Sequence, residues 1–249
     1  MKTRTRIAGA MLAVTAAVAP SVSHASGEDG WQWMAEPYAW VASISTDMRT
    51  FSPPTEAGSD ASFSDIVDKL DGVFMGRIEG RNARFGVFAD FIYLGLADST
   101  QHRVLRTSTD LDARLLDAAA TLRVSGAHDH GLEVYGGARY IDLDLATRFE
   151  PDNPAFAPRS IDAGRSYVDF LLGARYTWPL SGRWNLAVRG DGSAGETDGT
   201  WSASLTAGYL TRSGAWLFGY RHVEADLGGP NSDVTLRLGG PVVGYGFRF

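Results

Sequence analysis

Charged side chains of opposite sign recur at alternate positions in several segments of this sequence. Arg77 and Glu79 show this spacing in one segment, and Arg189 and Asp191 show it in another. Arginine suits enclosed ion pairs because its planar guanidinium matches a carboxylate with two hydrogen bonds and stays protonated. Lys69 is the only lysine after residue 25, so almost every cation in that part of the chain is an arginine. The pattern predicts a network of ion pairs in an enclosed space.

The side chains that we expect to share this interior are Glu36, Arg77, Glu79, Arg81, Asp90, Asp117, Arg123, Glu133, Arg139, Asp169, Arg175, Arg189, Asp191, Arg221 and Arg248. Two interpretations remain open at this stage. The charges either fill and stiffen the interior, or they line a small pore with a charge-selective constriction. In both cases, removing one charge should destabilise the fold by about 3–5 kcal/mol, because its partner is left buried and uncompensated.

Histidine is the other residue type that could carry chemistry. His128 and His130 lie close together, and His222 follows Arg221, but no further ligand stands at the spacing of a zinc site. We therefore predict no metal and no cofactor. His102 lies near Asp98 in a predicted connection, which leaves a surface hydrolase acting on lipid or peptide as an alternative. No hydrolase motif accompanies it, and we predict a protein that is not an enzyme.

The first 25 residues have the pattern of a secretory signal peptide. Three basic residues precede an apolar run at residues 7–18, and Ser23 and Ala25 supply the small-x-small cleavage pattern. The whole chain has net charge −6, and since residues 1–25 carry three positive and no negative side chains, residues 26–249 carry −9. An acidic surface argues against nucleic acid as a partner. The absence of cysteine excludes disulfides and thiolate metal sites.

Alternation with period two dominates the chain from residue 31 onward and predicts β-strands with two different faces. We expect about ten strands, at residues 31–47, 73–82, 85–97, 110–124, 131–147, 166–178, 184–196, 201–212, 215–227 and 233–249. Short turns alternate with longer connections, of which residues 48–72 and 148–165 are the longest. Three prolines at positions 151, 154 and 158 should make the second of these connections stiff. This alternation is typical of a single closed antiparallel transmembrane β-barrel with short periplasmic turns and long outer loops.

The composition of the two strand faces favours a membrane barrel. In the strand at 166–178, Val168, Phe170 and Leu172 share one face, whereas Asp169 and Arg175 share the other. A soluble sheet also alternates, so a secreted lipocalin-like barrel remains an alternative. Aromatic residues gather near the strand ends, as expected for girdles at the two lipid–water boundaries. We therefore expect outer-membrane lipid to be the protein's surroundings.

The last strand ends in alternating aromatic residues. Tyr245, Phe247 and the terminal Phe249 form a pattern that looks like the signal by which outer-membrane barrels reach the barrel-insertion machinery. That machinery is therefore a predicted partner.

One segment departs from period two. Phe63, Ile66, Val67 and Leu70 are spaced as on one face of a helix, after Ser62 as a possible N-cap. We predict a short amphipathic helix at residues 64–71 that covers the barrel rim.

Several motifs resemble a broad group of proteobacterial outer-membrane β-barrel proteins, mostly of unassigned function. They are Trp33 with Pro37-Tyr38-x-Trp40, Ser62-Phe63-Ser64-Asp65-Ile66-Val67-Asp68-x-Leu70-Asp71, Phe74-Met75-Gly76 with Glu79-x-Arg81, Arg84-Phe85-Gly86-Val87-Phe88-x-Asp90 with Tyr93-x-x-Leu96, Gly219-Tyr220-Arg221 and Gly244-Tyr245-Gly246-Phe247-Arg248-Phe249. The likeness spans most of residues 26–249 and implies a fold and a location in the outer membrane. It implies no activity.

From the sequence we expect a structural or surface-interaction role for a barrel with a salt-bridged lumen. The alternatives are a narrow channel for small solutes or ions and, third, a surface hydrolase. The sequence names no surface ligand.

Overall fold

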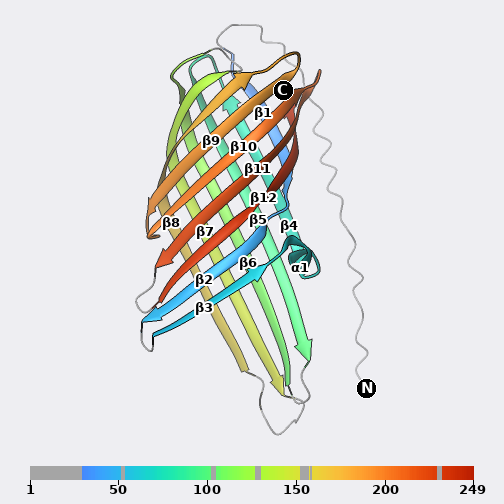
Figure 1. Ribbon diagram of the computed structural model, residues 1–249, viewed down its shortest axis with the longest axis vertical. Helices are drawn as coiled ribbons and strands as arrows, with labels where there is room; N and C mark the ends of the chain where they lie inside the picture. The colour runs from blue at the N-terminus through green and yellow to red at the C-terminus, as the bar shows by residue number, and fades with distance from the viewer. Residues whose placement is uncertain are drawn as a thin grey trace.

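The computed structural model describes residues 30–51, 54–101, 105–126, 130–151, 157, 159–228 and 232–249, so the predicted signal peptide lies outside the described residues. Ten antiparallel strands form a closed barrel (Figure 1), which confirms the predicted fold class. They are β1 (Gln32–Trp40), β4 (Leu70–Arg81), β5 (Phe85–Gln101), β6 (Leu105–Arg123), β7 (Gly131–Pro151), β8 (Arg159–Pro179), β9 (Trp184–Gly195), β10 (Gly199–Leu210), β11 (Gly214–Gly228) and β12 (Ser232–Arg248). Pairing between β1 and β12, with Met34 opposite Arg248, closes the sheet.

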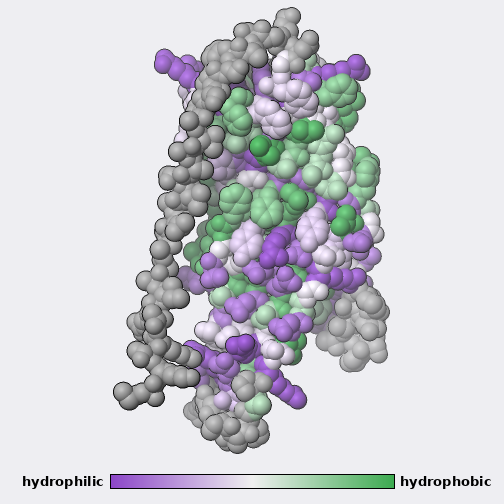
Figure 2. All heavy atoms as spheres, turned by 180° about the vertical axis from the view of Figure 1, so that it is seen from behind, coloured by the Kyte–Doolittle hydropathy of each residue, from purple (hydrophilic) through white to green (hydrophobic). Residues whose placement is uncertain are grey.

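The two faces of each strand meet different surroundings, as β8 shows. Val168, Phe170 and Leu172 point outward and are 52%, 61% and 57% exposed. Between them, Asp169 and Leu171 point inward and are 2% and 0% exposed. Removing apolar surface from water is worth about 25 cal/mol per Å², so an outer face of this kind is suited to hydrocarbon. Figure 2 shows hydrophobic residues over much of the upper wall and hydrophilic residues over the lower part.

The two ends of the barrel differ. One end is called here the turn end. It contains the short connections at residues 82–84 and 180–183, the beginning of β1 and the end of β12. At the opposite end, called here the loop end, β5 to β8 extend well beyond the rest of the wall (Figure 1). No helix within the described residues is long and apolar enough to cross a membrane.

The extension at the loop end corrects one predicted connection. Residues 148–165 do not form an eighteen-residue loop, because β7 and β8 stay paired there, with Phe149 opposite Arg159. Pro151 ends β7, whereas Pro154 and Pro158 lie outside the described residues. Continued pairing satisfies backbone groups that a loop would leave to water.

The prediction of a loop at residues 48–72 is also wrong. The segment contains the end of β2 (Ser43–Phe51), all of β3 (Pro54–Ala61), helix α1 (Phe63–Val67) and the start of β4. The predicted first strand is interrupted between β1 and β2, where Gly240 and Pro241 of β12 lie opposite. A Cβ on Gly240 would stand 1.9 Å from the carbonyl oxygen of Val41, and Pro241 lacks an amide hydrogen for the ladder.

Beyond this interruption the strands on the two sides of β1 separate. We call this region the fork, and it consists of β2, β3, α1 and residues 70–75 of β4. β2 continues along β12 and carries β3 on its other edge, whereas β4 pairs with β1 only through residues 76–81. Among the described residues no ladder joins β3 to β4. α1 contacts β2 and β3 and lies beside the start of β4 in Figure 1.

The predicted helix is present but shorter than expected, because β4 already begins at Leu70. Ser62 is its N-cap residue, and the backbone amide of Ser62 donates to Asp65 Oδ2 at 3.0 Å. Hydrogen bonds from the Ser62 hydroxyl and amide lower the pKa of Asp65. Ile66 is buried, whereas Phe63 and Val67 are exposed.

Candidate functional site: the charged lumen

Arg139 of β7 lies at the centre of one group of polar contacts in the lumen. Its Nε and Nη2 donate to the two oxygens of Asp117 on β6, at 2.7 and 2.8 Å. Nη2 also donates to Asp191 of β9 at 2.8 Å, and Nη1 donates to the Thr200 hydroxyl of β10 at 2.7 Å. One fully buried side chain therefore joins four strands through charge-assisted hydrogen bonds.

Arg175 of β8 connects parts of the wall that are not neighbours. Nη1 and Nη2 donate to Glu79 of β4 at 3.0 and 2.6 Å, and Nε donates to Glu133 of β7 at 2.9 Å. Glu79 also accepts hydrogen bonds from Arg77, and Glu133 lies 3.3 Å from Arg123. Since β5, β6 and β7 separate β4 from β8 in the sheet, the contacts between Arg175 and Glu79 cross the lumen.

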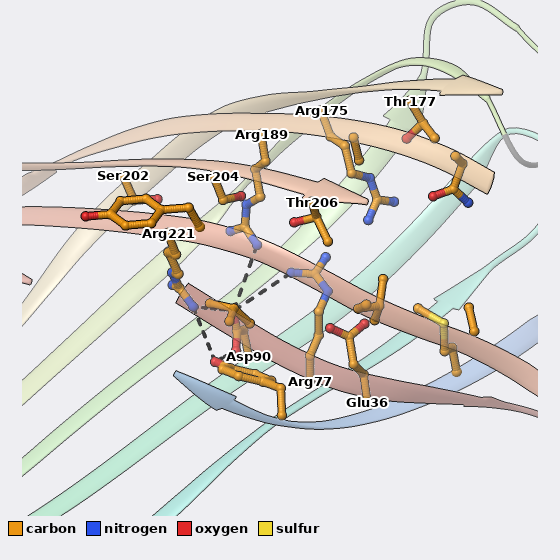
Figure 3. A pocket seen from close by; sticks show the side chains of 18 of the residues that line it. Glu36, Arg77, Asp90, Arg175, Thr177, Arg189, Ser202, Ser204, Thr206 and Arg221 are labelled. Carbon is orange, nitrogen blue, oxygen red and sulfur yellow. Dashed lines mark hydrogen bonds and ion pairs between the residues drawn. The ribbon is translucent and has the colours of Figure 1, made fainter. Parts of the chain in front are cut away.

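Asp90 of β5 faces three guanidinium groups. It accepts a hydrogen bond from Arg221 of β11 at 3.2 Å, and Arg77 and Arg189 lie 4.0 and 3.9 Å from the same oxygen. The Tyr38 hydroxyl of β1 donates to its other oxygen at 2.7 Å. Figure 3 shows the three arginine side chains reaching Asp90 from different strands. One negatively charged carboxylate thus lies within 4.0 Å of three positively charged guanidinium groups.

The remaining predicted lumen residues differ in their contacts. Asp169 forms no ion pair among the described residues and accepts hydrogen bonds from the hydroxyls of Ser193 and Thr197. Arg81 Nε lies 3.8 Å from Glu79. Glu36 and Arg248 both line the lumen cavity, and no ion pair of either is formed within the described ranges.

Tyr135 of β7 is a lumen residue that the sequence analysis missed. Its hydroxyl accepts from Arg189 Nε at 2.7 Å and donates to Asp191 at 2.9 Å. Its ring lies over Gly173, where a Cβ would come within 2.4 Å of the ring, and packs edge-on against Phe88. Tyr135 lies two residues after Glu133, so period-two alternation predicts that both side chains share the inward face.

An apolar layer also lies in the lumen, on the loop-end side of the charges, and the sequence analysis did not predict it. Trp40, Ile92 and Val223 are its buried centre. They come from β1, β5 and β11, and partly buried apolar side chains of further strands pack against them. Beyond lies a second buried cluster around Ile141 and Tyr167. A polar solute crossing the lumen would meet both kinds of layer.

On the turn-end side of the charges the lumen contains a cavity of about 180 Å³. Its charged lining is Arg77, Arg81, Arg175, Arg189, Arg221, Arg248, Glu36 and Asp90. Hydroxyls of Ser202, Ser204 and Thr206 on β10 form part of the wall. Within the described part of the chain, no group of three histidine or carboxylate side chains is placed to hold a metal ion.

Tyr245 and Phe247 lie on the outer face of β12. The Tyr245 ring packs edge-on against Trp216 and Phe247, and its hydroxyl contacts those of Thr211 and Ser213. Phe249 exchanges two backbone hydrogen bonds with Trp33, each 3.0 Å long, at the turn end. These aromatic residues therefore stand where the outer wall meets the turn end.

The closed wall, its apolar outer face and its enclosed polar lumen define the chain as a β-barrel of the Gram-negative outer membrane. Outer-membrane barrels usually place short turns in the periplasm and long loops outside, so we expect the turn end to face the periplasm. No family model matches the sequence, and no curated protein matches it.

Several solved structures share the barrel architecture. The attachment invasion locus protein Ail of Yersinia pestis, in complex with sucrose octasulfate, aligns over 89% of this chain and 99% of its own, with 10% identity and a TM-score of 0.41. The outer membrane protease OmpT of Escherichia coli aligns over 89% and 97%, with 8% identity and a TM-score of 0.46. The translocator domain of the autotransporter NalP from Neisseria meningitidis aligns over 90% of both chains, with 16% identity and a TM-score of 0.41. At this level of similarity, no activity transfers to the present chain.

Proposed function

We propose that this protein is a non-enzymatic, non-conducting barrel that displays its loop-end strands at the cell surface for interaction with another molecule. The single observation that carries the proposal is the filled section of the lumen on the loop-end side of the cavity. Arg139 and Leu171 have no accessible surface, and the contacts of Arg139 join four strands.

An ion passing through the lumen would have to cross two barriers, the buried charge pairs and the apolar layer. Breaking a buried charge pair costs about 3–5 kcal/mol because the partner is left uncompensated. The buried centre of the apolar layer, Trp40, Ile92 and Val223, carries only the indole N–H of Trp40 as a polar group, and this donor cannot replace the hydration shell of a cation. The closed state is therefore the stable one.

A change from apolar to charged residues on the outer face marks the level at which the barrel wall projects beyond the lipid. Outward positions of β6 and β7 change from apolar to charged, with Arg114 Nη1 donating to Asp142 at 2.6 Å and to Asp144 at 3.3 Å. From Arg114 to the start of β6, the strand continues for roughly 30 Å at about 3.3 Å per residue. This projecting sheet supports a role in display.

We also propose that the insertion machinery recognises the last strand. Tyr245 and Phe247 on the outer face of β12, together with the terminal Phe249, form a surface available for contact before the barrel is embedded.

Recording from planar bilayers tests the closed lumen. Purified protein, shown to be folded by faster gel migration before boiling than after, should give no discrete conductance. Steady single-channel steps would overturn the proposal, and a change in their ion selectivity after Arg139→Gln or Arg175→Gln would identify a channel instead.

Cysteine labelling tests the display, because the natural chain has no cysteine. Ser59→Cys on β3 should react with a membrane-impermeant maleimide on intact cells. Ser181→Cys, exposed at the turn end, is the matched control and should react only after the outer membrane is opened. The reverse pattern would contradict the proposed orientation.

A further inference from the structure

We propose that the lumen cavity at the turn end binds a small tetrahedral oxyanion of the phosphate class. This inference concerns a ligand site on the periplasmic side, and it stands whether or not the lumen conducts.

The first observation is an excess of positive charge around the cavity. Six arginines line it, against the two carboxylates of Glu36 and Asp90. Four inward carboxylates that do not line the cavity neutralise part of this charge, namely Glu79, Glu133, Asp191 and Asp117. Glu133 and Asp191 are shared with Arg123 and Arg139, which do not line the cavity. Guanidinium groups therefore remain in excess, and the cavity attracts anions.

The second observation is that two of these arginines keep unused donors. Nη2 of Arg221 and Nη2 of Arg189 are both buried without a hydrogen-bond acceptor among the described residues. Arg221 is only 8% exposed, and Arg189 Nη2 lies 3.6 Å from Oδ2 of Asp117, beyond hydrogen-bond distance. Buried donors without acceptors are rare in proteins because they cost free energy. Small movements of either side chain toward the cavity would allow an anion to supply the missing acceptor.

The third observation is the arrangement of neutral donors. Ser202, Ser204 and Thr206 occupy successive inward positions of β10 and line the same cavity as Arg189 and Arg221. The Ser202 hydroxyl already donates to Asp191, so Ser204 and Thr206 are the neutral donors that remain for a ligand. Figure 3 shows them near Arg77, Arg189 and Arg221, which converge on Asp90. Donors from several directions suit a tetrahedral ion with oxygens on every side better than they suit a planar carboxylate.

The cavity also has an approach from the turn end. Arg81, Arg248 and Met34 line both this cavity and a second hollow at the barrel mouth, which is bordered by Gln32 and Phe249. Two arginines at the mouth favour entry of anions over cations.

The experiment measures binding of inorganic phosphate and of sulfate to the purified barrel in a non-ionic detergent, by calorimetric titration and by the ³¹P line width of phosphate. Saturable binding is expected for both ions. Binding should survive a constant background of chloride, which lacks the oxygen acceptors. Glycerol phosphate as competitor distinguishes the source: competition supports a site for phosphate esters, and binding of the free ion alone supports a site for inorganic phosphate.

Two variants locate the site. Arg221→Gln should weaken phosphate binding at least tenfold. Because Arg221 also contacts Asp90, Ser204→Val serves as a second variant that leaves every charge in place and should weaken binding several-fold. Arg237→Gln is the matched control, since it removes the same charge from the outer face of β12, where Arg237 pairs with Asp47 and Glu224. The control should bind as the natural protein does.

Absence of saturable binding to the natural protein would overturn the proposal. Equal binding by the natural protein, Arg221→Gln and Ser204→Val would also overturn it, because the ion would then bind elsewhere. Neither result would bear on the bilayer recordings, so the two proposals fail separately.

Discussion

The charged lumen and the fork use the same ionic groups in opposite surroundings. In the lumen, Arg139 and both of its carboxylate partners are completely inaccessible, and the surrounding ladder is continuous. In the fork, Arg49 and Glu56 form a 2.9 Å pair across β2 and β3, but both side chains are more than 60% exposed. Water and salt screen the second pair, whereas the first is enclosed. The comparison teaches that burial and the number of hydrogen bonds, rather than distance, decide what an ion pair contributes.

The largest effect should come from Arg139→Met. It removes four hydrogen bonds and leaves Asp117 and Asp191 with only Arg189 as a cation, 3.6 and 3.2 Å away. The free energy of unfolding should therefore fall by about 3–5 kcal/mol. The measurement is the urea midpoint at which the form that migrates faster before boiling disappears.

Arg49→Met makes the same substitution in the fork and is the matched control. Because its pair is exposed, the expected change is within about 1 kcal/mol. Equal losses in the two variants would remove the contrast between the regions.

A second prediction compares neighbouring residues on the two faces of one strand. Leu171 is fully buried with Phe88 and Tyr135, so Leu171→Ala should cost about 2–5 kcal/mol. Leu172→Ala changes the adjacent, outward residue and should cost much less, because lipid fills the space that the side chain leaves. The same urea titration measures both, and a larger loss for Leu172→Ala would reverse the assignment of the faces.

A third prediction concerns the fork alone. Ile66→Ala removes the buried contact of α1 and should destabilise that helix locally by about 2 kcal/mol, the lower end for such substitutions. Hydrogen exchange should accelerate in residues 63–67 while the urea midpoint of the barrel stays unchanged. A shift in the global midpoint would show that the fork and the closed wall unfold as one unit.

The smallest effect should be the pH dependence of α1. The hydrogen bonds from Ser62 lower the folded-state pKa of Asp65 below its ordinary value of 3.8. The stabilisation is therefore complete above that value and is lost as the pH falls through the lower, folded pKa. Exchange protection of α1 should stay constant from pH 7 to about 5 and decrease in more acidic solution. Asp65→Asn should abolish this dependence, and a variant that keeps it would assign the titration to another group.

Much of the wall could be predicted because period-two alternation is a local property of the sequence. The strands and the helix were found in this way, with errors mainly at the loop end, where both faces become polar and the alternation fades. The fork could not be found locally. It depends on Gly240 and Pro241 meeting residues 41–42 across a pairing of distant strands.

The apolar layer of the lumen could have been predicted from the sequence. Trp40, Ile92 and Val223 each follow an inward polar residue by two positions, namely Tyr38, Asp90 and Arg221. Comparing inward residues at one height across several strands would have separated the charged layer from the apolar layer. Which carboxylate each arginine contacts could not be predicted, because that choice depends on strand register and side-chain reach.

The seam between β1 and β12 has a consequence for assembly. It joins residues 34 and 248, nearly the whole described length apart, so its formation carries a large loop-closure entropy and favours slow folding. Until that seam forms, Arg139 and Glu79 remain open to water on an incomplete sheet, and their desolvation is deferred to the final step. The pairing of β1 with β12 is thus the contact that removes water from the charged interior.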